Sequence, residues 1–181
     1  MRSSILFATL TLLSATFTSA APINRRALSL RAYNEMSISS GVGGDAEARA
    51  KAVWSQGLDL SNLAAISDAD LDILKVERSN AESAETDAFN PAIDAASGDD
   101  KAALQVGKIA NKVLKLTGLA QVRQIGIAKK EAKGQTVSDS ERAALQDSLT
   151  KLAKNIATDK KNAGKPSKAV SFVGQTSVKK Q

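Results

Sequence analysis

The stretch that most constrains the fold is residues 104–117, which shows a sharp helical periodicity and contains no proline and no cluster of turn residues. At 100° per residue, aliphatic and small side chains gather on one face of a helix and lysines on the opposite face. The apolar face consists of Val106, Ile109, Ala110, Val113, Leu116 and Ala120, and the basic face of Lys108, Lys112 and Lys115. We predict an amphipathic central helix whose apolar face is covered by other helices.

Composition narrows the range of functions. The 181-residue chain has 3% aromatic residues and neither cysteine nor histidine. The absence of histidine excludes a Ser-His-Asp triad, and the absence of cysteine excludes a thiol nucleophile, a cysteine zinc site and any disulfide. We find no catalytic constellation, expect no cofactor or metal, and predict that the protein is not an enzyme.

The N-terminus has the pattern of a secretory signal peptide over residues 1–20. Arg2 is followed by the apolar run 5–13 and by small residues up to Ala20, where we expect cleavage. The pair Arg25–Arg26 then indicates either a propeptide, residues 21–26, that secretory proteases remove, or a plain charge pair in a terminal segment. No other run has the roughly 18 apolar residues of a transmembrane helix. We therefore expect a secreted, extracellular protein, with the cell wall as one destination.

The charge is divided along the chain. Residues 45–100 contain 13 acidic and 4 basic side chains, whereas residues 101–181 contain 17 basic and 5 acidic ones. Opposite halves of this kind can attract each other in the folded chain. We expect the acidic segment 67–88 to lie against the basic helices.

Capping residues divide residues 27–166, the predicted helical domain, into segments. Residues 32–39 suggest a short strand or an extended arm. We predict a helix from Ala46 to about Trp54, a longer one over 67–88, a short one restarting at Asn90–Pro91, the central helix up to Lys133, and a last helix after Ser138. The N-terminal capping residues are predicted to be Asp45, Ser67, Asn90, Asp99 or Asp100, and Ser138, the last with Glu141 in a capping box.

The central helix contains three glycines. Gly107, Gly118 and Gly126 each cost about 1 kcal/mol relative to alanine in a helix interior. We therefore expect either a break or a close helix crossing, and the continuity of the helix across Gly118 is left open. Gly134 is placed to end the helix.

The last helix has a narrow apolar stripe of Leu145, Leu149, Leu152 and Ile156. Gly164 and Pro166 end it, and the polar, basic tail 167–181 is expected to be disordered. Together these segments predict an all-α bundle of about four helices, including the long central one.

Three further features each allow two interpretations. Asp68, Asp70 and Asp72 resemble the start of a calcium loop, but Ile73 and Ser79 occupy the positions that require Gly and Glu, which favours a solvated helical turn. Trp54 is either a core residue or, less in keeping with so few aromatics, a sugar platform. The face of Lys108, Lys112 and Lys115 is a candidate binding face for an anionic polymer or lipid, or is neutralised by the acidic segment. We do not expect it to bind nucleic acid, because it lacks interleaved aromatics.

Four segments resemble a family of cysteine-free small secreted proteins of filamentous fungi, of the effector-candidate type. They are AYNEMSISSG at 32–41, AETDAFNPAIDAASGD at 84–99, LQVGKIANKVLKLTG at 104–118 and LAKNIATDK at 152–160. The resemblance implies a fungal, secreted origin and supplies no activity or site residues.

We therefore expect a secreted, non-enzymatic helical protein that acts by binding at the fungal cell surface or the host interface. The partner is either a protein or an anionic surface polymer, and the oligomeric state stays open. The alternative is an amphipathic protein that binds a hydrophobic surface, lipid or cell-wall polymer, similar in size and helical composition to fungal hydrophobic-surface-binding wall proteins.

Overall fold

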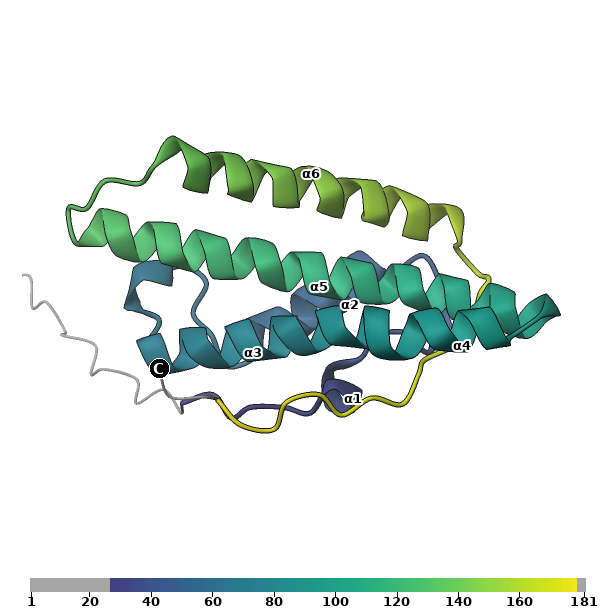
Figure 1. The fold of residues 1–181 in the computed structure, drawn as a ribbon. Helices are drawn as coiled ribbons and strands as arrows, with labels where there is room; N and C mark the ends of the chain where they lie inside the picture. Colours follow the sequence, from purple (N-terminus) through teal and green to yellow (C-terminus); the bar gives the residue numbers. More distant parts are fainter. Residues whose placement is uncertain (1–26, 179–181) are drawn as a thin grey trace, which may run out of the picture.

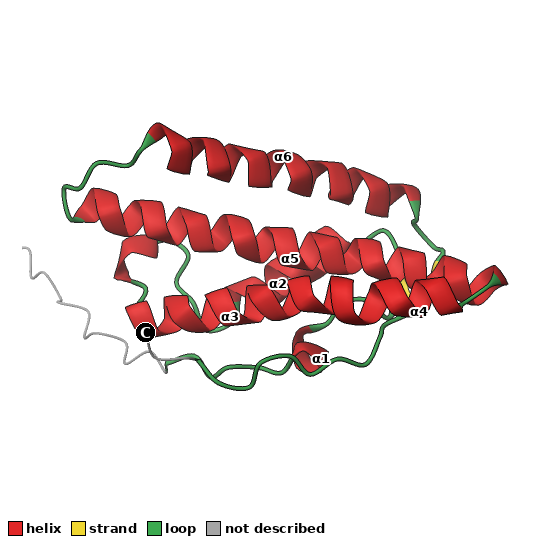
Figure 2. Ribbon diagram, viewed as in Figure 1, coloured by secondary structure: helices red, strands yellow, loops and turns green. Residues whose placement is uncertain are grey.

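The long helix α5 is the axis around which the other elements pack (Figure 1). The computed structural model describes residues 27–178. Along this part of the chain the elements are α1 (Tyr33–Met36), β1 (Gly41–Val42), α2 (Ala46–Ser55), the 3-10 turn η1 (Leu63–Ala65), α3 (Asp68–Ala84), the π-helical turn η2 (Glu85–Phe89), α4 (Asn90–Ala95), α5 (Gly98–Ala132), α6 (Asp139–Lys161) and β2 (Pro166–Ser167). The predicted all-α bundle with a long central helix is confirmed (Figure 2).

Helix α5 is unbroken over its 35 residues, a length of about 50 Å at 1.5 Å per residue. The close approach expected at its glycines occurs twice. A Cβ atom on Gly107 would lie 2.0 Å from the carbonyl oxygen of Lys168, and one on Gly118 would lie 2.4 Å from Cζ2 of Trp54. The helix ends as predicted at Gly134, whose φ of +66° allows the amide of Gln135 to donate to the carbonyl of Lys130 at 2.9 Å.

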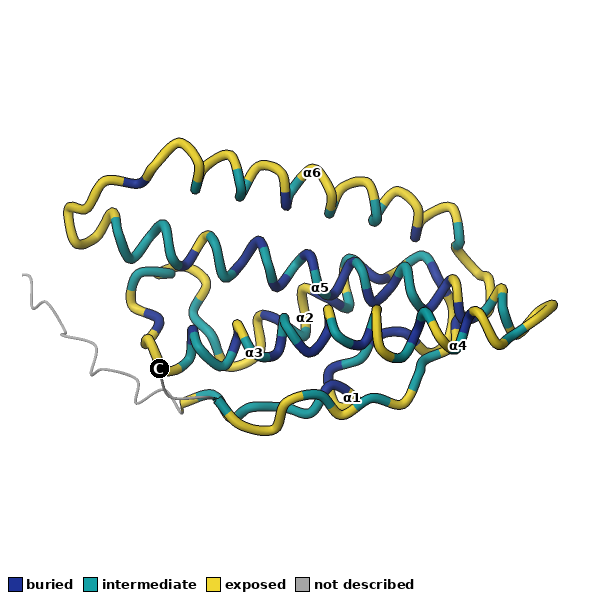
Figure 3. The backbone as a smooth tube through the Cα atoms, in the orientation of Figure 1, coloured by how far each residue is buried: buried dark blue, intermediate teal, exposed yellow. Residues whose placement is uncertain are grey.

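The core lies between α5 and the helices α2 and α3, which carry most of the buried residues coloured dark blue in Figure 3. Its largest fully buried apolar side chains are Trp54, Tyr33, Phe89, Met36, Leu74, Leu114, Ile125 and Val113. The acidic segment packs on the basic helix as expected, and Lys129 pairs with Asp68 at 2.8 Å across α5 and α3.

Helix α3 does not stop at Asn90. The backbone stays helical through η2 into α4, and the amide of Asn90 donates to the carbonyl of Glu85, five residues earlier. Pro91 has no N–H and would crowd the carbonyl of residue 87, and the wider π turn accommodates it. The prediction of a new cap at Asn90 is therefore wrong.

Two further cap predictions are wrong. Helix α5 begins at Gly98, so that Asp99 and Asp100 lie in its first turn instead of capping it. Asp45 occupies the N-cap position of α2 but makes no side-chain cap bond. The carboxylate of Asp159, from α6, replaces it and accepts from the amides of Gly44 at 3.1 Å and Ala46 at 2.9 Å.

Residues 32–39 form neither a strand nor a purely extended arm. Tyr33–Met36 is one helical turn, α1, because the Glu35 carboxylate accepts from the Ala32 amide at 2.9 Å and stabilises the start of the turn. Tyr33 is fully buried, and its hydroxyl donates to Oδ1 of Asn111 at 2.9 Å. Burial raises the pKa of Tyr33, although the hydrogen bond from the Ser37 hydroxyl counteracts part of the rise.

The predicted disorder of the tail is wrong for residues 167–178. We call residues 165–178 the C-terminal strap, because they run extended along the bundle beside the N-terminal segment (Figure 1). Strand β2 pairs antiparallel with β1, and the Lys168 amide donates to the Ala103 carbonyl at 3.0 Å. The side chain of Asn80 then both accepts from and donates to the backbone of Gln175, at 2.7 and 3.0 Å.

Candidate functional site

Helix α6 is the least embedded long helix of the described chain (Figure 3). Only Ser148 and Asp159 are buried among its 23 residues. Its predicted apolar stripe does lie on α5, but each of its four residues is only half-buried. We call the contact between these two helices the α5–α6 seam. Because α6 packs mainly on α5, grooves open along the sides of this contact.

Polar contacts fix α6 at both ends. Near its C-terminus, Asp159 binds the start of α2. At its N-terminus, Lys130 pairs with Glu141, and Arg142 pairs with Glu131 at 3.1 Å. The predicted capping box is confirmed, with the Glu141 carboxylate accepting from the Ser138 amide at 3.0 Å. The Lys130 hydrogen bond, followed by those from Ser138, lowers the pKa of Glu141 to about 2.

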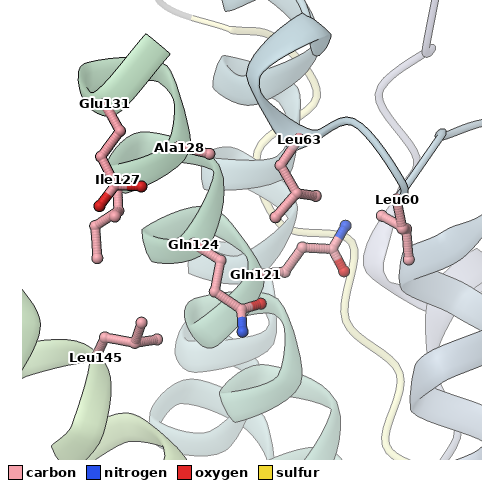
Figure 4. A pocket seen from close by; sticks show the side chains of 8 residues that line it. All are labelled: Leu60, Leu63, Gln121, Gln124, Ile127, Ala128, Glu131 and Leu145. Carbon is pink, nitrogen blue, oxygen red and sulfur yellow. The ribbon is translucent and has the colours of Figure 1, made fainter. Parts of the chain in front are cut away.

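A cleft of about 480 Å³ opens at the seam between the η1 loop, α5 and α6. Figure 4 shows that its side chains come from all three segments. The cleft is lined by Leu60, Leu63, Gln121, Gln124, Ile127, Ala128, Glu131 and Leu145. We call it the η1 cleft. Leu60 is 45% exposed, so its side chain is accessible at the edge of the cleft.

The η1 cleft combines an apolar lining with a few polar groups. Its three leucines and one isoleucine come from the η1 loop, α5 and α6, and the amide of Gln124 lies among them (Figure 4). Gln121 is held in place because its Nε2 donates to the Trp54 carbonyl at 2.9 Å. Ligand sites commonly have this character and volumes of about 300–1,000 Å³. The η1 cleft can therefore bind a ligand, and its lining residues include no nucleophile paired with a base.

The predicted lysine face does not point into either groove of the seam. Lys115 and Lys112 pair with Glu85 at 2.7 and 3.3 Å, and Lys108 donates to Asn90. Burial of Glu85 raises its pKa, but the two lysines lower it more, so that the net pKa lies below 4.5. The acidic segment therefore pairs with Lys112 and Lys115 through Glu85, as one of the two interpretations predicted, whereas Lys108 binds the neutral amide of Asn90.

Two other sequence features have structural explanations. Trp54 is 1% exposed and its Nε1 donates to the Leu114 carbonyl at 2.8 Å, so it is a core residue. Asp68 binds Lys129, which lowers its pKa, whereas Asp70 accepts from the Leu28 amide and Asp72 pairs with Lys75. These three carboxylates thus serve three different partners. The processing residues Ala20, Arg25 and Arg26 lie outside the described residues.

Sequence reasoning missed the η1 cleft and one important cation. The cleft depends on the loop at 56–67 folding back on α5, which has no local signal. Arg123 is on the same side of α5 as the three lysines, yet it reaches under α6 and donates to the Ala144 carbonyl and the Ser148 hydroxyl. One signal in the sequence was available. Close packing explains Gly107 and Gly118, and the remaining interior glycine, Gly126, lines a pocket together with Arg123.

Comparison with known families gives one match. The sequence profile described as a domain of unknown function, DUF8454, matches residues 28–171. The chain belongs to the DUF8454 family. No curated protein and no solved structure matches it. The DUF8454 match spans the helices of the bundle and residues 165–171, the first half of the C-terminal strap. Among residues 27–178, no helix is long and apolar enough to cross a membrane.

Proposed function

We propose that this protein is a secreted, non-enzymatic binding protein that acts at the fungal cell surface or the host interface. The η1 cleft is the observation that carries the proposal, and its occupant is a protein partner that inserts apolar side chains. The signal-peptide pattern supports secretion. The resemblance of four segments to small secreted proteins of filamentous fungi supports the source and the effector-like role.

The shape of the η1 cleft supports a protein partner. Leu60 and Leu63 form one wall and Leu145 the other, and two glutamines and a glutamate lie along α5 between them (Figure 4). An apolar centre with a polar rim is the usual composition of a protein interface. Anchoring side chains of a partner would contact the leucines, and its backbone would bind the amide groups.

Affinity capture tests this proposal. The secreted chain is immobilised and incubated with host apoplastic extract at low and at high salt, beside the variant Leu60→Glu. Leu60 is exposed, so this substitution changes the cleft and leaves the core intact. We expect a protein that is retained by the wild type at high salt and lost from the variant. Equal retention by both chains would contradict the cleft as the binding site.

The loose packing of α6 favours a second candidate function. A helix with two buried residues and a lysine-rich outer surface can leave α5 and place its apolar stripe on a lipid or another hydrophobic surface. Vesicles containing an anionic phospholipid would then broaden the thermal transition and change the amide exchange of α6. A sharp transition that the vesicles leave unchanged would exclude this opening. Retention on cell-wall polymer that salt removes would instead indicate adhesion through surface charge.

A further inference from the structure

Gly126 is the one glycine in the interior of α5 for which packing supplies no reason. Gly107 accommodates the strap and Gly118 accommodates Trp54, but a Cβ atom on Gly126 would meet nothing within 4 Å. Glycine weakens a helix interior relative to alanine, so its use here needs another explanation. The open space above Gly126 provides one, because it belongs to a pocket.

This second pocket lies on the side of the α5–α6 seam away from the η1 cleft. It has a volume of about 250 Å³ and an apolar lining that includes Val122, Ile127 and Ala144. Ile127 also lines the η1 cleft and separates the two spaces. For comparison, an engineered cavity of about 150 Å³ in another protein binds benzene. We call this space the Gly126 pocket; it has room for a short aliphatic chain or one ring.

Three charged side chains line or border the Gly126 pocket. Lys130 and Glu141 neutralise each other, and Glu141 is further occupied by the amide and hydroxyl of Ser138 at 3.0 and 2.9 Å. Arg123 forms no ion pair with any carboxylate of residues 27–178. One positive charge at the pocket is therefore uncompensated.

The guanidinium of Arg123 also has unused hydrogen-bonding capacity. Both of its hydrogen bonds within the described chain come from Nη1, to the Ala144 carbonyl and the Ser148 hydroxyl. These two bonds hold the side chain in position, and a guanidinium carries five N–H donors in a planar fork. The Nε and Nη2 donors remain available, and this fork matches the two oxygens of a carboxylate.

We propose that the Gly126 pocket binds a small monocarboxylate with an apolar body. The carboxylate pairs with Arg123, and the apolar group occupies the space above Gly126 between Val122 and Ile127. The charge, the donor fork and the missing side chain all converge on one ligand class. The proposal does not depend on the proposed function, because the pocket and the η1 cleft lie on different sides of α6.

The test is a titration of the full secreted chain with octanoate, followed by amide NMR shifts and calorimetry. Octanol provides the chain without the charge, and acetate provides the charge without the chain. We expect saturable binding of octanoate, with shifts at Gly126 and Ala144, and binding at least tenfold weaker for octanol and acetate. Absence of saturable octanoate binding, or equal binding of octanol, would overturn the proposal.

Variants locate the site. Gly126→Leu fills the pocket with a good helix former, and Arg123→Met removes the charge while keeping an unbranched apolar stem. Each should weaken octanoate binding at least tenfold. Lys108→Met, which removes a cation elsewhere on α5, and Leu60→Glu, in the η1 cleft, should bind as the wild type does. Thermal melting first shows that each variant unfolds cooperatively. If Gly126→Leu then binds octanoate as tightly as the wild type does, that result is enough to refute the site.

Discussion

The indole ring of Trp54 lies against the backbone of Gly118, so close that a Cβ atom there would be 2.4 Å from Cζ2. The ring is fixed in this position because its Nε1 donates to the Leu114 carbonyl, one turn earlier in α5. The absence of a side chain at residue 118 thus allows α2 to pack closely on the central helix. We therefore expect substitution by alanine to have opposite effects on stability at Gly118 and at Gly126, the second of which has no close neighbour.

Gly118→Ala should destabilise the protein by about 1–3 kcal/mol, the range for overpacking a core, despite alanine's higher helix propensity. Gly126→Ala is the matched control. Because nothing lies within 4 Å of its Cβ position, it should gain up to about 1 kcal/mol. Urea unfolding of the three chains measures both effects. A stabilised Gly118→Ala would mean that the indole ring can move aside at little cost.

Asp159→Ala should destabilise the protein by about 2–3 kcal/mol, because the half-buried amide of Gly44 and the buried amide of Ala46 lose their acceptor. Asp159→Asn, which keeps one acceptor oxygen, should lose less. The control is Asp45→Ala, which occupies the N-cap position but makes no cap bond, and should change stability by less than about 0.5 kcal/mol. If Asp45→Ala proves the more damaging change, α2 is capped locally.

Capping shows why some predictions from the sequence hold and others fail. The Ser138–Glu141 box and the Gly134 end depend on residues within one or two turns, so the local sequence specifies them. The cap of α2 comes from Asp159, more than a hundred residues away, while an aspartate stands at the local position. Local patterns cannot distinguish these two aspartates, because the difference arises only when α6 lies over the start of α2.

Neither the strap nor the candidate site could be predicted, because both depend on contacts between residues that are far apart in the sequence. The strap is polar and basic, and it is ordered by Asn80, Tyr33 and Gly107, all distant in sequence. The periodicity of α5 placed its lysines on one side correctly, but it could not tell which cations the acidic segment neutralises. Glu85 pairs with Lys112 and Lys115, whereas Arg123 has no carboxylate partner in the described chain.

Asn80→Ala should loosen the strap. Asn80 is 1% exposed and makes both a donor and an acceptor bond with the backbone of Gln175, so its loss should cost about 2 kcal/mol. Amide exchange should accelerate at Gln175 and at Tyr33, whose amide donates to the Val173 carbonyl. Lys168→Met, which removes an exposed ion pair with Asp100, is the control and should leave both amides protected. Acceleration in both variants would place the weak point at β2 instead.

Acid should weaken the protein partly through Glu85. Its pKa is lower in the folded state than the ordinary 4.5, so its contribution is complete above that value and is lost as pH falls through the folded pKa. Glu85→Gln should cost about 1–2 kcal/mol at pH 7, because Lys115, only 18% exposed, loses its partner. The difference between variant and wild type should then shrink as pH is lowered from 5 to 3. Parallel pH profiles would show that the two lysines interact with Glu85 no more strongly in the folded state than in the unfolded chain.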